Sequence, residues 1–175
     1  PARAFSATLS LAELCRQTGQ GEEARTLLDR LAPDAADRPV ADRVRYHLAR
    51  GLLAGREGEL ASAERSFREA VGLLEEAPDP LLAAEAHERY ADLLLSFVRE
   101  SPARLATEAQ RCLKESAERY RAIGAGNAAE RVESLRETAR KEAVDADLAD
   151  LRGERDRLQF LQRIGRLLNA ELDLD

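Results

Sequence analysis

The sequence contains few of the side chains that commonly carry out chemistry, and it does not group them. The two histidines, His47 and His87, each lie in a helical pattern with no second histidine four residues along the chain. Two histidines four residues apart are the usual way in which one helix face binds zinc, and neither histidine has such a partner. Nothing in the sequence places a hydroxyl and a carboxylate beside either imidazole, as a Ser–His–Asp triad requires. The sequence therefore predicts no metal site and no hydrolytic triad.

Two glutamates flank one of these histidines, Glu85 and Glu88 around His87. Such neighbours are commonplace in a chain that is 34% charged, and we interpret the group as a solvated helix face. The glycine stretches "GREGE" and "GAGN" lack the strand, the longer loop and the Lys-Ser/Thr pair of a phosphate-binding loop. We therefore predict a non-enzymatic chain that holds no cofactor.

The two cysteines, Cys15 and Cys112, are far apart and both lie in helical patterns. A disulfide framework needs more cysteines in a shorter chain, so we expect two small buried side chains. This favours a reducing, cytoplasmic location. No apolar run approaches the roughly 20 residues that span a bilayer, and we predict no membrane interaction.

The charge balance argues against a nucleic-acid partner. The net charge is −6, whereas domains that bind nucleic acids usually carry a basic face. Arg43, Arg45 and Arg50 cluster, but Asp42 and Glu57 dilute them. Aromatic residues make up only 4% of the chain, which is typical of packed amphipathic helices and too few for a β domain. We expect an all-α fold.

The helices recur in pairs. Residues Leu11–Leu31 and His47–Val71 each read as a helix, a glycine-containing turn and a second helix. Superposing the two, with one extra residue in the second turn, matches Leu11/Leu48, Ala12/Ala49, Cys15/Leu52, Ala24/Ala63, Leu28/Phe67 and Leu31/Ala70. A third pair follows at Pro80–Val98 and at Ala103 to about Ile123, and a longer helical pattern runs on from Ala128.

The second pair resembles the tetratricopeptide repeat (TPR). The residues that carry the resemblance are Leu48-Ala49, Leu52, Gly58, Ala63, Phe67 and Ala70, and they recur more weakly as Leu11-Ala12, Cys15, Gly19, Ala24, Leu28 and Leu31. The third pair keeps Tyr90-Ala91, Ala109 and Ala117. The resemblance implies a right-handed superhelical solenoid of helical hairpins over residues 1–140.

Residues 141–175 form a narrow apolar seam flanked by Arg and Glu. Its members are Leu148, Leu151, Leu158, Leu161, Ile164 and Leu168. Spacings of three, four or seven residues favour a two-stranded coiled coil, most simply a homodimer through the same helix of a second chain. The alternative is that the helix folds back onto the repeats.

The last residues resemble the helix that enters a GAF sensor domain in bacterial signalling proteins. The matching positions are Leu168, Asn169, Glu171, Leu172, Asp173 and Leu174. The resemblance implies that the chain is a segment of a larger regulator, with a GAF domain beyond it. Regulators of this kind end in a sigma-54-type transcriptional activator or a histidine kinase, and some have a protein-kinase domain upstream. The rival interpretation is a stand-alone TPR adaptor.

The resemblance also implies a concave groove that binds a protein or peptide. Carrying over the inward positions gives Glu13, Arg16, Gln17, Arg43, Tyr46, Arg50, Glu85, Glu88 and Asp92. Such a groove is basic in its middle and acidic toward the third pair. We expect Tyr46 to be an exposed aromatic anchor beside arginines. The alternative is that these side chains are ordinary solvated groups.

Overall fold

In a computed structural model, the chain is all-helical over the residues that the structure describes, which are 2–76, 78–97 and 102–172. The helices are α1 (Ala2–Gln17), α2 (Gly21–Ala35), α3 (Val40–Arg56), α4 (Leu60–Glu76), α5 (Pro80–Ser96), α6 (Pro102–Ala122) and α7 (Gly126–Leu172). No β-strand occurs in these ranges. The predicted all-α class is confirmed.

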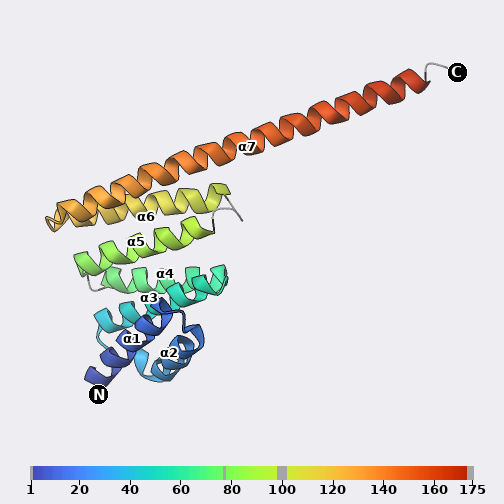
Figure 1. The fold of residues 1–175 in the computed structure, drawn as a ribbon. Helices are drawn as coiled ribbons and strands as arrows, with labels where there is room; N and C mark the ends of the chain where they lie inside the picture. Colours follow the sequence, from blue (N-terminus) through green and yellow to red (C-terminus); the bar gives the residue numbers. More distant parts are fainter. Residues whose placement is uncertain (1, 77, 98–101, 173–175) are drawn as a thin grey trace.

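The helices stack in the order of the sequence. Each helix packs against the next, and α3 also contacts both α1 and α5. Figure 1 shows the resulting layered body, with α1 and α2 at one end and α7 across the other. Because every contact is between near neighbours in sequence, each helix depends on the one before and the one after it. The elongated stack leaves α1, α3 and α5 side by side.

Three turns of the chain have the same geometry. Gly19, Gly58 and Gly124 all have positive φ, between 75° and 88°. After Gly19, the amide of Gln20 donates to the carbonyl of Cys15 at 2.8 Å, and the turns at Gly58 and Gly124 repeat this bond. This is a Schellman cap, in which only glycine adopts the left-handed conformation without steric cost. The next helix begins two residues after the glycine, so these glycines fix how tightly α1–α2, α3–α4 and α6–α7 fold back.

The equal turns correct the alignment of the first two pairs. When the two pairs are aligned so that Gly19 matches Gly58, the residues of their first helices match as Phe5/Val44, Leu9/Leu48, Ala12/Gly51 and Cys15/Ala54. All of these residues are buried. The expected matches Leu11/Leu48, Ala12/Ala49 and Cys15/Leu52 are wrong, and the second turn has no extra residue. Leu11 is in fact exposed. The matches in the second helices, Ala24/Ala63, Leu28/Phe67 and Leu31/Ala70, are confirmed as pairs of buried residues.

Two clusters of buried apolar side chains hold the stack together. The smaller lies between α1, α2 and α3 and includes Phe5, Leu28 and Tyr46. The larger runs from α3 to α7 and includes Phe67 and Tyr90, whose rings stack with centroids 5.0 Å apart. Both cysteines are buried and free, as predicted. Burial of this kind supplies most of the stabilising free energy of a helical protein.

Helical spacing predicts one inward face for each helix of the third pair, and the structure confirms these faces, with Phe97 at the end of the first one only half-buried. Leu82, Ala86, Tyr90, Leu93 and Leu94 of α5 are buried, as are Leu105, Ala109, Leu113, Ala117 and Tyr120 of α6. Helix α5 starts sharply because the Asp79 carboxylate accepts a hydrogen bond from the amide of Leu82 at 3.0 Å, and Pro80 occupies the first turn. The start of α5 is therefore encoded locally, and its packing face follows from helical periodicity.

Helix α7 runs without a break through Gly153. Its first turns pack on α6, and Ala139 is the last buried residue among its described side chains. Beyond that point the described side chains are exposed, and Figure 1 shows the helix projecting past the end of α6. Within the described residues, none of the helices has the length and apolar character needed to cross a membrane. A long exposed helix is thus joined directly to the packed body.

A glycine-to-alanine substitution tests the close packing of α3 on α4. A Cβ on Gly51 would lie 2.7 Å from Cδ2 of Phe67, a fully buried ring held against Tyr90. We expect Gly51→Ala to lower the free energy of unfolding by about 1–3 kcal/mol, because overpacking outweighs the gain in helix propensity. Gly72→Ala in α4, where a Cβ has open space, should instead raise it by up to about 1 kcal/mol. Urea denaturation measures both, and equal effects would contradict the packing argument.

Candidate protein-binding groove

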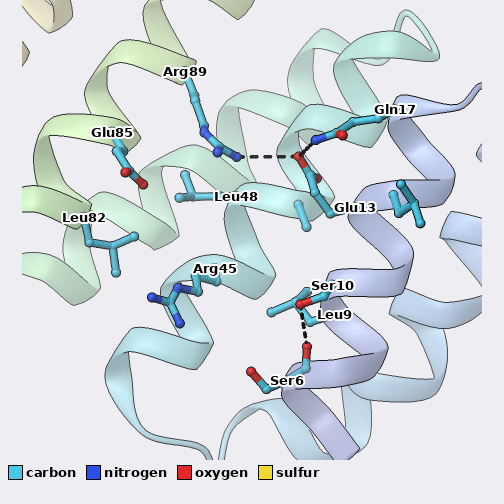
Figure 2. A pocket seen from close by; sticks show the side chains of 12 residues that line it. Ser6, Leu9, Ser10, Glu13, Gln17, Arg45, Leu48, Leu82, Glu85 and Arg89 are labelled. Atoms are coloured by element: carbon cyan, nitrogen blue, oxygen red, sulfur yellow. Dashed lines mark hydrogen bonds and ion pairs between the residues drawn. The ribbon is translucent and has the colours of Figure 1, made fainter. Parts of the chain in front are cut away.

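A groove of about 430 Å³ crosses the first helices of the stack. Side chains from α1, α3 and α5 line it, and Figure 2 shows them converging on one space. The lining residues are Ser6, Leu9, Ser10, Glu13, Leu14 and Gln17 of α1, Arg45, Leu48 and Ala49 of α3, and Leu82, Glu85 and Arg89 of α5. The groove lies where α3 contacts both α1 and α5.

The floor of the groove is apolar and its sides are polar. Leu9, Leu48 and Leu82 contribute the floor and are each at least 94% buried, whereas Leu14 is exposed at the edge. Arg45 and Arg89 are exposed charged groups on α3 and α5, and Glu85 is half-buried. An apolar floor with a few polar groups around it is the usual character of a binding site.

Glu13 is the most connected polar group of the groove. Its carboxylate accepts hydrogen bonds from Arg16 at 2.7 and 3.0 Å and from Gln17 at 3.2 Å, all within α1. It also forms an ion pair with Arg89 of α5 at 3.7 Å, which spans the groove. The hydrogen bonds from Arg16 are the main reason why the pKa of Glu13 lies below its usual value. Glu13 is therefore ionised at neutral pH and holds one side of the groove in place.

The structure brings only part of the predicted groove set together. Glu13, Gln17 and Glu85 line the groove, and Arg16 lies beside it as a partner of Glu13. Arg43, Tyr46, Arg50, Glu88 and Asp92 do not line it. The predicted charge pattern is found in part. Arg45 of α3 makes the middle of the groove basic, but on α5 the positive charge of Arg89 offsets the negative charge of Glu85.

The prediction that Tyr46 is an exposed aromatic anchor is wrong. Its side chain is only 3% exposed and lies 6.4 Å, centroid to centroid, from the ring of Phe5. Arg50 covers this ring, with its guanidinium 5.8 Å from the centroid. The carried-over positions on α3 are out of register with the groove. Residues 46 and 50 share one helix face, and Arg45 and Leu48 share another.

Several groove residues were missed by sequence reasoning. Leu48 was named only as a position of the repeat resemblance, and Arg45 only as part of a weak basic run. Helical spacing does link Leu82, Glu85 and Arg89, which lie on one face at intervals of three and four. That interval was the available signal, but only tertiary contacts show that this face meets those of α1 and α3.

Glu88 has a structural role behind the groove. It is 92% buried and accepts a hydrogen bond from the hydroxyl of Tyr120 in α6 at 3.0 Å. Arg131 of α7 donates to both of its oxygens, to Oε2 at 3.1 Å. Burial and this hydrogen bond raise the pKa of Tyr120 to about 12. Glu88 thus joins α5, α6 and α7, and its prediction as a groove residue is wrong.

Asp92 lies one turn beyond Glu88 and is exposed. Partial loss of hydration and the nearby negative charge of Glu88 raise its pKa, while Arg131 opposes the change. Its position places it with the Glu88–Arg131 pair and away from the groove lining.

The interpretation of His87 as part of a solvated face is also wrong. The side chain is 3% exposed, its Nε2 lies 3.4 Å from Oε2 of Glu115, and its Nδ1 has no hydrogen-bond partner among the described residues. Burial lowers the pKa of His87, and the charge of Glu115 only partly opposes this shift. The imidazole is therefore a neutral core group packed between α5 and α6.

Comparison of the chain with protein-family models, with curated proteins and with solved structures gave no match. The TPR and GAF resemblances therefore rest on the sequence motifs alone. Over the part of the chain that the structure describes, no group of three or more His, Cys, Asp or Glu side chains is placed to hold a metal ion.

A double-mutant cycle tests the Glu88–Arg131 pair. The variants Glu88→Gln, Arg131→Gln and their combination should give a coupling energy of about 1.5–3 kcal/mol in the free energy of unfolding, since Glu88 is buried. The exposed pair Glu137–Arg140, 3.5 Å apart on α7, is a matched control that should give about 0.5 kcal/mol or less. Equal coupling in the two cycles would show that Glu88 does not join the helices.

The pH dependence of stability tests the buried state of His87. Because its pKa is lower in the folded chain than in the unfolded chain, the unfolded state binds more protons below pH of about 6.5. Stability should therefore fall as the pH drops from about 6.5 toward 5, and His87→Leu should reduce that fall. His47→Leu should also reduce the fall, because burial lowers the pKa of His47 as well, although its pair with Glu69 at 2.8 Å opposes the shift. Urea denaturation at each pH measures the slopes, and an unchanged slope in His87→Leu would count against this account.

Proposed function

We propose that this chain is a non-enzymatic interaction and relay segment. Its groove binds a segment of a protein partner, and α7 pairs with the same helix of a second copy. The observation that carries the proposal is the row of apolar side chains left exposed on α7 after the packed body ends. Val144, Leu148, Leu151, Leu158 and Leu161 are 45–62% exposed. Burying such a row against a partner helix is favourable, because it removes apolar surface from water.

The spacing of this row supports pairing between identical helices. Val144, Leu151 and Leu158 recur at seven-residue intervals, and Leu161 follows three residues later. A seven-residue repeat keeps one narrow seam facing a partner along the whole helix. Ile164 and Leu168 continue the predicted seam, but their side chains lie outside those that the structure describes.

Helix α5 supports the relay part of the proposal. Its residues Glu85 and Arg89 face the groove, whereas Glu88, between them in sequence, is bonded to Arg131 of α7. A partner that shifts α5 by binding in the groove therefore also acts on the helix that carries the seam. The groove and α7 are thus joined through α5 by direct contacts, which supports the relay.

The TPR and GAF motifs suggest where such a segment operates. We propose a bacterial multidomain regulator, with a sigma-54-type transcriptional activator as the output, in which α7 leads toward a GAF domain. A TPR region of a serine/threonine or histidine kinase is the alternative, as is a stand-alone adaptor in which only the groove matters. Asp173 and Leu174 of the GAF motif lie outside the described residues. We also propose that the chain works in the cytoplasm, where it binds protein and does not itself contact nucleic acid.

Substitutions on α7 test the pairing. We expect the chain to be a dimer by light scattering at micromolar concentration, and Leu151→Glu/Leu158→Glu to make it a monomer by placing charge in the seam. Phe160→Glu is the matched control, because Phe160 is as exposed as Leu151 but lies on the opposite side of the helix from the seam. A wild-type monomer at high micromolar concentration, or equal dissociation by Phe160→Glu, would refute this part of the proposal.

A further inference from the structure

The charged groups of the groove divide into two kinds. Glu13 is satisfied by Arg16 and Gln17, and it pairs with Arg89 across the groove. Arg45 and Glu85, in contrast, form no hydrogen bond or ion pair with another of the described residues. The groove thus presents one cation and one anion that are not paired within the described residues.

The apolar floor of the groove lies next to these two charged groups. In the view of Figure 2, the side chains of Leu48 and Leu82 lie between those of Arg45 and Glu85. Arg45 and Leu48 follow each other on one face of α3, and Leu82 and Glu85 do so on α5. A ligand that covers the leucines therefore approaches both charged groups.

We propose that the groove binds a peptide segment with an apolar side chain flanked by an acidic and a basic one. The apolar side chain covers Leu48 and Leu82, the acidic group pairs with Arg45, and the basic group pairs with Glu85. This inference rests on the proposed function, because it assumes that the groove is the site at which the chain binds a protein partner.

Desolvation selects this charge pattern. Covering the groove removes water from Arg45 and Glu85, and a charge that loses water without gaining a counter-charge disfavours binding. A purely apolar ligand leaves both Arg45 and Glu85 unpaired. A ligand with charges of only one sign pairs with one of these two groups and is repelled by the other. Complementary charges on both sides of the floor therefore provide both specificity and orientation.

A displayed library of random peptides tests the inference on the full chain. We expect selection to enrich peptides in which an apolar residue lies between an acidic and a basic one. For a selected synthetic peptide, replacing its acidic residue with glutamine should weaken binding about tenfold by calorimetry, a change of about 1.4 kcal/mol. The same replacement should have little effect on the variant Arg45→Gln, which already lacks the pair. Replacing the basic residue should behave in the same way with Glu85→Gln.

Two control variants separate this inference from the proposed function. Ser10→Trp fills the groove from α1, and Arg43→Gln removes a charge on α3 that does not line it. We expect Ser10→Trp to abolish peptide binding and Arg43→Gln to leave it unchanged, with both variants as helical as the wild type by circular dichroism.

The outcomes are distinct. If Ser10→Trp abolishes binding but Arg45→Gln and Glu85→Gln do not weaken it, the charge pattern is refuted while groove binding stands. If the library yields no binder, or if Ser10→Trp leaves binding intact, both the charge pattern and the groove as a binding site are refuted.

Discussion

A buried carboxylate sets the arrangement of the last three helices. Glu88 lies almost fully out of water, and an ionised carboxylate in that position is tolerated only when donors compensate it. Tyr120 and Arg131 supply those donors from α6 and α7. Replacing this polar group by an apolar one would leave the helices packed but would remove the geometric requirement that α7 start at a set position on α6. The hydrogen bonds of Glu88 therefore fix how α7 is placed against α5 and α6.

Helix α5, which carries Glu88, also lines the groove. Glu85 lies about one turn before the buried carboxylate and Arg89 directly follows it, and both line the groove, so a shift of α5 at the groove also disturbs its bonds to α6 and α7. In the proposed relay, α7 carries this disturbance away from the packed body. The groove, the contacts of Glu88 with Tyr120 and Arg131, and the exposed apolar row on α7 would then form one path.

Helical periodicity accounts for most of what the sequence predicted correctly. The inward faces of α5 and α6 follow from apolar residues at intervals of three and four, because those intervals place side chains on one side of a helix. Gly19, Gly58 and Gly124 mark the tight turns for a conformational reason that is local to each residue. Errors arose where a motif was carried over with an incorrect register. One such shift placed Tyr46 and Arg50 in the groove and left out Arg45 and Leu48, since neighbouring residues on a helix point about 100° apart.

The sequence by itself determined the helical class, the turn positions, the burial of both cysteines and the apolar row on α7, because each depends on local conformation or on the spacing of side chains along one helix. Tertiary structure alone decided that α1, α3 and α5 share a groove, that Glu13 meets Arg89 across it, and that His87 and Glu88 are buried. Those features join residues that are far apart in the chain, so no single helix contains the information. A charged residue on a helix looks solvated in the sequence until a neighbouring helix removes the water from around it.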